Sequence, residues 1–268
     1  MIEYFFRSSR FISRLIEAIR LWGRNDREAA LMLARNLGRY TMHPLFDALS
    51  EESEPSTRKL LLYVLSGLGS DVLPEALKML NDERWYVARN MIYLIRECGG
   101  SQHAKQIRQF AKHKNRKVSL EAVKTLIHFN TPDAFSNLKL YLTSNDPDLR
   151  SQAVGLAGVY KVTDAVPYLL EMLKKKDIIG RDLDFKIQII RTLGKIRDPR
   201  AVNVLTTLYN SKSIFFKGSF EELRVEIFRS LENYPIEPVK PLLQAGLASK
   251  NDEIRNISEK LIARMNNE

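Results

Sequence analysis

The stretch DLRSQAVGLAGVYKVTDAVPYLLEML, residues 148–173, contains two short amphipathic segments separated by a turn. In the first segment Ala153, Leu156 and Val159 are three residues apart, which is the spacing of one face of a helix. Tyr168 follows nine residues after Val159 and belongs to a second apolar stripe. The stretch therefore predicts a helical hairpin.

The same pattern recurs along the chain. The residues that occupy the position of Val159 are Leu37, Leu68, Cys98, Phe129, Val159, Ile196, Tyr234 and Met265, and their spacings are 31, 30, 31, 30, 37, 38 and 31. The residue three positions earlier is apolar in every copy, and the residue six positions earlier is apolar in every copy except the last, which has Glu259. A hairpin of about 30 residues cannot bury its apolar face alone, so neighbouring copies must stack. We predict an all-α, right-handed α-solenoid of seven to eight hairpins, with 1–24 as an N-terminal cap and 25–268 as repeats of a single domain.

The clearest copies, residues 148–173 and FKIQIIRTLGKIRDPRAVNVLTTL at 185–208, resemble HEAT repeats. They share a basic residue and then Ala or Leu in the first helix, a short Gly or Asp turn, and Pro-x-Leu or a similar sequence in the second helix. The short period resembles the bacterial HEAT-like class that is also seen in phycobilisome lyases. The resemblance covers residues 25–268 and implies that second helices line the concave face.

Composition restricts the function classes. With 44% hydrophobic and 28% charged residues among 268, the chain is expected to fold. Its single cysteine, Cys98, occupies a core position, and four histidines leave little material for a metal site, so we expect no cofactor, no metal and no enzyme activity. The His-Glu dipeptides of HEAT-like di-iron hydroxylases are absent.

Targeting signals are also absent from the sequence. The longest uncharged stretch, Leu60 to Ser70, is shorter than the roughly 20 apolar residues of a membrane span. Four arginines interrupt the apolar runs of residues 1–24, which therefore lack the core of a signal peptide. We expect a cytoplasmic protein.

The net charge of +10 makes acidic partners worth testing. Basic residues are densest between Cys98 and Leu120, a stretch without acids, and they are Lys105, Arg108, Lys112, Lys114, Arg116 and Lys117. This cluster is either a phosphate or acidic-peptide site or a solvated helix face. The resemblance would direct Lys105, Arg108 and Lys112 inward.

Trp85 and Tyr86 begin an unusual first helix. They either stack on a base or peptide, or fill the junction between repeats. With the nearby Asp82, they keep open an alternative function as a nucleic-acid-binding relative of HEAT-like alkylpurine DNA glycosylases. A phycobilin lyase-like function is a further alternative.

A basic residue also recurs once per hairpin near the start of the first helix. The members of this ladder are Arg27, Arg58, Arg89, Arg150, Lys186, Arg224 and Arg255. They either hold phosphates or pair with acids and helix ends within the stack, and the acids that recur beside them favour pairing.

The two long spacings arise from insertions between a second helix and the next first helix, KKKDIIGRDLD at 174–184 and SKSIFFKGSF at 211–220. Both fall on the same edge of adjacent hairpins. Their apolar and basic residues predict a protein-binding patch, unless they only extend the helices: Ile178, Ile179, Arg181, Phe215, Phe216 and Lys217. We therefore expect a scaffold that binds another protein through its concave face and this edge.

The N-terminal segment 9–22 has one apolar stripe, which includes Ile12, Ile16, Ile19 and Trp22, with arginines beside it. Such a helix either caps the open end of a solenoid or lies in a membrane surface, and we favour the cap. Residues expected to cap the first helices at their N-termini are Asp26, Ser56, Asp148 and Asp252.

Overall fold

The computed structural model describes residues 9–23, 25–174, 182–211 and 217–265, and within these ranges it contains only helices and the turns between them. The prediction of an all-α chain of stacked helical hairpins is confirmed. An N-terminal helix, α2 (Ser9–Trp22), precedes the hairpins. The first helices of the hairpins are α3 (Arg27–Leu37), α5 (Pro55–Gly67), α7 (Trp85–Cys98), α9 (Arg116–His128), α11 (Pro147–Val159), α13 (Leu183–Ile196), α15 (Lys217–Leu231) and α17 (Asp252–Met265).

The second helices are shorter and are often preceded or followed by a turn of 3₁₀-helix. They are α4 (Arg39–Glu51), α6 (Leu73–Lys78), α8 (Ala104–Arg108), α10 (Ala134–Leu142), α12 (Val166–Lys174), α14 (Val202–Asn210) and α16 (Ile236–Leu247). The flanking 3₁₀ segments are η1 (Gly69–Val72), η2 (Met79–Asn81), η3 (Ser101–His103), η4 (Gln109–Lys112), η5 (Thr163–Ala165) and η6 (Pro199–Ala201).

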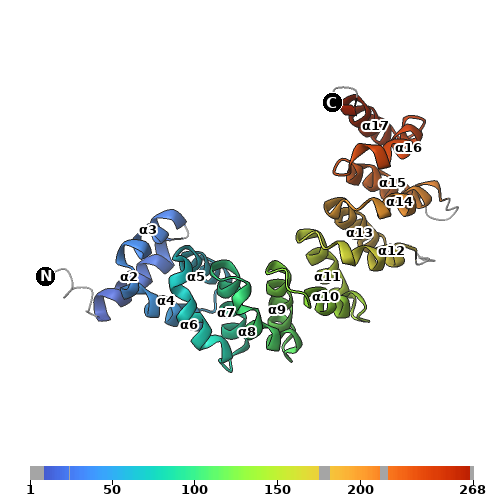
Figure 1. The fold of residues 1–268 in the computed structure, drawn as a ribbon. Helices are drawn as coiled ribbons and strands as arrows, with labels where there is room; N and C mark the ends of the chain where they lie inside the picture. The colour runs from blue at the N-terminus through green and yellow to red at the C-terminus, as the bar shows by residue number, and fades with distance from the viewer. Residues whose placement is uncertain (1–8, 24, 175–181, 212–216, 266–268) are drawn as a thin grey trace. The chain divides into compact units, whose positions relative to one another are not determined.

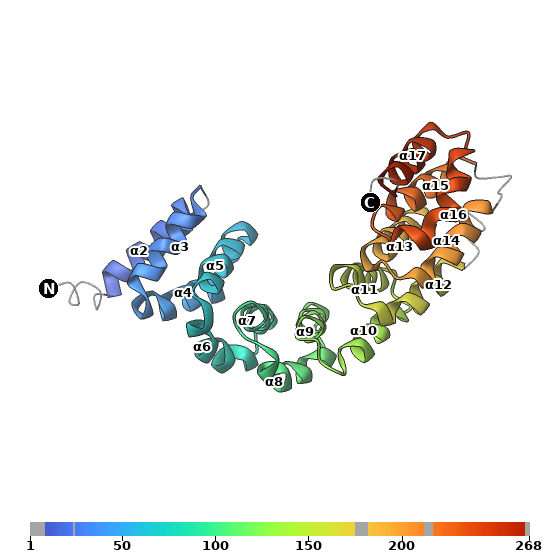
Figure 2. The ribbon, with the colours of Figure 1, turned by 45° about the horizontal axis from the view of Figure 1, so that its top comes forward.

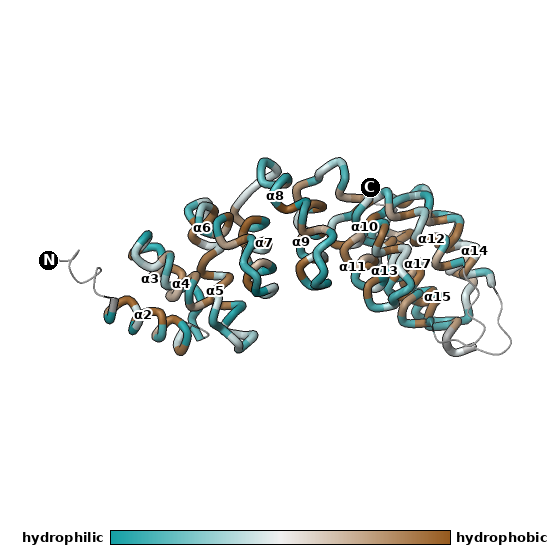
Figure 3. Tube along the Cα trace, turned by 90° about the horizontal axis from the view of Figure 1, so that it is seen from below, coloured by the Kyte–Doolittle hydropathy of each residue, from teal (hydrophilic) through white to brown (hydrophobic). Residues whose placement is uncertain are grey.

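The chain divides into two compact units, Met1–Ala134 and Phe135–Glu268. Within each unit the first helices form one layer and the second helices the other (Figures 1 and 2). Along each helix hydrophobic residues alternate with hydrophilic ones, as expected for helices that bury one face (Figure 3).

The core follows the repeat. At the position six residues before the repeat marker, all seven apolar residues are buried: Leu31, Leu62, Ile92, Val123, Ala153, Ile190 and Phe228. The markers themselves lie at the ends of the first helices or just beyond them, and their burial differs: Ile196 and Tyr234 are buried, whereas Val159 is 65% exposed. The sequence period therefore correctly identifies the buried residues within each first helix. It is less reliable for the marker residues at the helix ends.

The helix starts are partly as predicted. Asp26 caps α3, accepting a hydrogen bond from the backbone N–H of Ala29 at 2.9 Å. The predictions for Ser56 and Asp148 are wrong, because the caps are Glu54 and Asp146. Pro55 and Pro147 follow these caps, and proline is favoured as the first residue of a helix, which moves each start two residues upstream.

The C-terminal helix α17 departs from prediction in a similar way. Asp252 is its first residue rather than its cap. The side chain of Asn251 accepts the N–H groups of Glu253 and Ile254 at 3.0 and 3.3 Å. The predicted cap is therefore wrong by one residue.

Each unit is packed more tightly on one side. First helices of successive hairpins lie directly against one another, as α7 does against α9 and α11 against α13, whereas second helices have few contacts across hairpins. Short second helices bring less surface to their layer. The first helices thus form the narrow side of each unit, so the expectation that second helices, and with them Lys105, Arg108 and Lys112, line the inner face is wrong for these hairpins.

Helix α2 packs on α4 and α5 at the N-terminal end of the first unit. Ile12, Ile16 and Ile19 are buried in this contact, and Arg20 forms an ion pair with Glu52 at 2.7 Å. Trp22, by contrast, is 70% exposed. The isoleucine stripe therefore packs against the first hairpins, whereas Trp22 takes no part in this contact, and the role of 1–24 as a cap stays a prediction.

Candidate functional site

Several arginines of the ladder donate hydrogen bonds to the backbone of the preceding loop. Arg58 donates to the carbonyl oxygens of Glu52 and Ser53 at 2.9 and 3.1 Å. In the same way Arg150 reaches Ser144 O at 2.6 Å, and Arg255 reaches Ser249 O at 2.6 Å. These carbonyls lie beyond the end of a second helix, where no intrahelical donor is available. The interpretation of these residues as contacts to helix ends is confirmed for these positions.

The narrow side of the first unit carries charges of both signs. Arg96 is buried and forms ion pairs with Glu121 and, at 2.9 Å, with Glu97. Its guanidinium also lies over the ring of Tyr93, with 4.8 Å between Cζ and the ring centroid. Burial lowers the pKa of the neighbouring Lys124, which is 3.8 Å from Glu121. This surface is a paired network that joins α7 to α9.

The second unit repeats this arrangement over three helices. Arg191 on α13 forms a bidentate pair with Glu226 on α15 at 2.8 and 2.9 Å. Arg229 lies 3.6 Å from Glu226 and donates to Glu253 on α17 at 2.8 Å. The Glu226 side chain is only 8% exposed, so its charge requires these partners.

The predicted basic cluster is partly engaged in local contacts. Arg108 forms a bidentate pair with Asp133 at 2.7 and 2.8 Å, which lowers the pKa of that carboxyl. Lys117 lies over the Trp85 ring, with 5.0 Å between Nζ and the centroid. Lys105 and Lys112 are exposed. One face of the Trp85 ring is thus covered by Lys117, and Arg108 is paired with Asp133. Lys105, Arg108 and Lys112 therefore do not form a common binding site with an uncovered Trp85 ring.

Trp85 joins two hairpins. It is 36% exposed, packs edge-on against Tyr86 with 5.8 Å between the ring centroids, and is covered on one face by Lys117 of the next first helix. The nearby Asp82 is held by Arg84 through bonds of 2.9 and 2.7 Å, which lower its pKa. These contacts resemble those of a junction between repeats.

A cavity of about 350 Å³ lies on the loop edge of the second unit. We call the loop edge the side of the stack on which each second helix is connected to the next first helix. Its connections in the second unit are residues 142–147, 174–183, 210–217 and 247–252. The cavity is lined by the end of α10 and the loop that follows it, the first turns of α11, the helix α12, and the start of α13. Its apolar part comes from Leu142, Met172 and Phe185, and its cations are Arg150 and Lys186.

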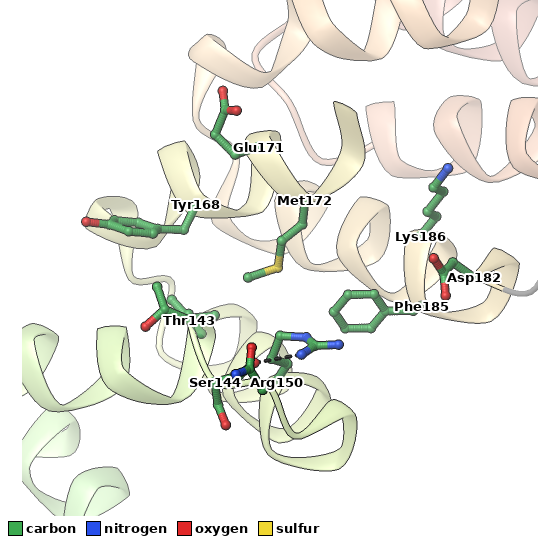
Figure 4. Close-up of a pocket in the computed structure, with 11 residues that line it drawn as sticks. Thr143, Ser144, Arg150, Tyr168, Glu171, Met172, Asp182, Phe185 and Lys186 are labelled. Carbon is green, nitrogen blue, oxygen red and sulfur yellow. Dashed lines mark hydrogen bonds between the residues drawn. The ribbon is translucent and has the colours of Figure 1, made fainter. Parts of the chain in front are cut away.

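The side chains of this cavity are arranged so that apolar and basic groups meet. Met172 and Phe185 both project into the cavity, and the guanidinium of Arg150 lies beside them (Figure 4). The rim acid Glu171 points away from these residues and is paired with Lys174 at 2.7 Å (Figure 4). The opening thus offers an apolar contact next to a cation.

HEAT repeats match residues 73–154 and 136–216, which together make up more than half of the 268 residues. The chain belongs to the HEAT-repeat family. Its HEAT-repeat fold is similar to that of human deoxyhypusine hydroxylase in complex with glycerol, at 16% identity and a TM-score of 0.40, with 97% of this chain and 99% of that chain covered. No curated protein matches the chain.

Two further solved structures are similar to this HEAT-repeat protein. The complex of CpcE and CpcF of phycocyanin lyase from Nostoc sp. matches at 14% identity and a TM-score of 0.42, covering 92% of this chain and 93% of that chain. An engineered protein matches at 14% identity and a TM-score of 0.27, covering 96% of both chains.

The predicted edge residues fall unevenly on the described HEAT repeats. Ile178, Ile179, Arg181, Phe215 and Phe216 lie outside the described residues, as does the side chain of Lys217, the first residue of α15. The cavity residues Met172 and Phe185 were not predicted from the sequence. A signal for them exists, since both lie within three residues of the first insertion, but helical spacing alone assigns them to the hairpin.

Signs of catalysis are weak in the described HEAT repeats. Burial raises the pKa of Cys98 to about 11, and its thiol donates to the carbonyl of Ser66 at 3.4 Å. Over the described ranges no group of three His, Cys, Asp or Glu side chains is placed to hold a metal ion. In the same ranges no single helix has the length and hydropathy of a membrane span, although Pro55–Gly67 and Gly69–Asn81 meet the test as a pair bent by 116°.

Proposed function

We propose that this HEAT-repeat scaffold is non-catalytic and binds another protein through the loop edge of its second unit. The observation that supports this is the cavity in which Met172 and Phe185 lie beside Arg150. An apolar contact with a charged group next to it is the usual composition of a protein-binding hot spot. Both insertions, at 174–184 and 211–220, fall on the same edge.

The narrow side argues for a protein rather than a nucleic acid. A groove that follows a phosphate backbone needs a run of unpaired positive charge. On the first helices the arginines instead form cross-hairpin pairs with buried glutamates, as Arg96 does with Glu121 and Arg191 with Glu226. This surface holds the stack together, which leaves the edge for a partner.

The test is affinity capture with chemical cross-linking, from a lysate of the cells that encode the protein. The double variant Met172→Ser plus Phe185→Ser removes the apolar part of the cavity. Val159→Ser is the matched control, because Val159 is exposed at the far end of α11, about 18 Å along the helix from its start. We expect the wild type and the control to capture the same proteins, and the double variant to lose them. Equal capture by the double variant would contradict the proposal.

The nucleic-acid alternative predicts a different result. If Lys105, Lys112 and their basic neighbours bind duplex DNA, affinity must fall steeply with salt, with a log–log slope of about −5 for about six phosphates. We expect no such slope, because Arg108 and Lys117 already have partners within the first unit. A slope near −5, abolished by Lys105→Gln plus Lys112→Gln, would replace the protein-binding proposal.

A further inference from the structure

The cavity on the loop edge contains Arg150, most of whose hydrogen-bonding capacity is unused within the described residues. A guanidinium has five N–H donors. Within the described residues Arg150 uses one nitrogen, Nη1, which donates to Ser144 O at 2.6 Å, and it has no carboxylate partner there. The remaining donors face a cavity that also contains Met172 and Phe185.

At the same ladder position farther along the edge, Arg224 is an arginine whose nitrogens all have hydrogen-bond acceptors. A second hollow, of about 330 Å³, contains Arg224. All three of its nitrogens are engaged, with Tyr209 O at 3.0 Å, Ser211 O at 2.8 Å and the carboxylate of Glu221 at 2.5 Å. Arg255 likewise has a carboxylate from Asp252, three residues earlier in the chain.

The difference has a simple cause in the sequence. Three residues before Arg224 and Arg255 the helix has an acid, but three residues before Arg150 it has Pro147. Proline is favourable at the first position of α11, yet it cannot supply a counter-ion. Within the described residues the charge of Arg150 is therefore not paired with a carboxylate, and it is available to one from a bound group.

We propose that this cavity binds a peptide in which an Asp or Glu lies close to a large apolar side chain. The carboxylate would take the free donors of Arg150 in the bidentate geometry that guanidinium favours, and the apolar side chain would enter between Met172 and Phe185. Lys186 adds a second positive charge to the lining, and Asp182 adds a negative one. This inference rests on the proposed function and names the chemistry of the segment that the edge would recognise.

The test is a selection from a phage-displayed library of random heptapeptides on the full wild-type chain. Selected peptides are synthesised with a fluorescein label, and their affinities are measured by anisotropy. We expect an Asp or Glu within two residues of Phe, Leu or Met. Replacing that acid by its amide should weaken binding about tenfold or more, as expected for a lost charge-assisted pair.

Variants separate recognition from folding. Arg150→Gln should weaken the acidic peptide about tenfold and bind the acid and amide peptides equally. Arg255→Gln is the matched control: it loses an equivalent helix-end bond of 2.6 Å to Ser249, and should leave affinity unchanged. A binding loss of equal size in both variants would point to folding and overturn the inference.

The outcomes also separate this inference from the proposed function. Peptides without an acid whose binding depends on Phe185 would overturn the inference and leave the protein-binding edge intact. Peptides indifferent to both Arg150→Gln and Phe185→Ala, or no selected peptide, would overturn both.

Discussion

At the level of single residues, the position of many polar side chains is explained by a nearby backbone N–H or C=O group that has no partner within its helix. Three of the ladder arginines, Arg58, Arg150 and Arg255, donate to a carbonyl six residues upstream, although the spacing of the ladder would also suit a row of phosphate-binding residues. The sequence predicted their recurrence, but not which acceptor each would choose. Similarly, Glu54 takes the cap of α5 from Ser56, because Pro55 sets the start of the helix.

Cys98 is the candidate nucleophile if the protein were an enzyme. We expect its thiol to react slowly with alkylating reagents. Burial raises its pKa from 9.0 to about 11, so at pH 8 the reactive thiolate is about 100-fold scarcer than for an ordinary thiol. Alkylation by iodoacetamide, followed by mass spectrometry at pH 8, should be correspondingly slow. The same protein unfolded in guanidinium chloride is the control and should react at the ordinary rate. Fast alkylation of the folded chain would revive Cys98 as a nucleophile.

At the scale of elements, the helices were the most predictable feature. Offsets of three and six residues identified the buried stripe of each first helix, because apolar burial has the same period as the helix itself. Helix α2 was harder to interpret, since one stripe on a terminal helix fits both a cap and a membrane surface. Only packing on α4 and α5 separates Ile19, which is 2% exposed, from Trp22.

Helix α2 gives a direct comparison of these two residues. We expect Ile19→Ala to lower the free energy of unfolding by about 2–4 kcal/mol, because it leaves a hole in the contact with α4 and α5. Trp22→Ala should change it by less than about 0.5 kcal/mol, since most of the ring already faces solvent. Urea denaturation measures both. Equal losses would mean that Trp22 has a partner in the folded chain.

At the scale of the whole molecule, the sequence predicted the stack but not the cavity. The lining of the cavity comes from residues 142–186, and which side chains meet depends on how successive first helices pack. The same packing places the first helices on the narrow side of each unit. The family resemblance had suggested that the second helices would line this side. The pair Arg108–Asp133 was missed for the same reason, because its partners are 25 residues apart.

Two compact units imply two foldable halves. Stability in a repeat array comes from each repeat and its immediate neighbours, so residues 1–134 and 135–268 should each fold when made separately. We expect each fragment to be helical by circular dichroism and to unfold cooperatively in urea. An unfolded fragment would show that its stability depends on the other half.

Arg224, in the middle of α15, has a practical consequence for engineering. Arg224 reaches back over an insertion to Tyr209 and Ser211, 15 and 13 residues away, whereas Arg150 and Arg255 span six. It therefore closes the base of the inserted segment, and doubling the length of a closed loop costs only about 0.6 kcal/mol. Between Ser211 and Lys217 a foreign sequence, such as an epitope or a fluorescent reporter, can be grafted while the hairpins on either side keep their register.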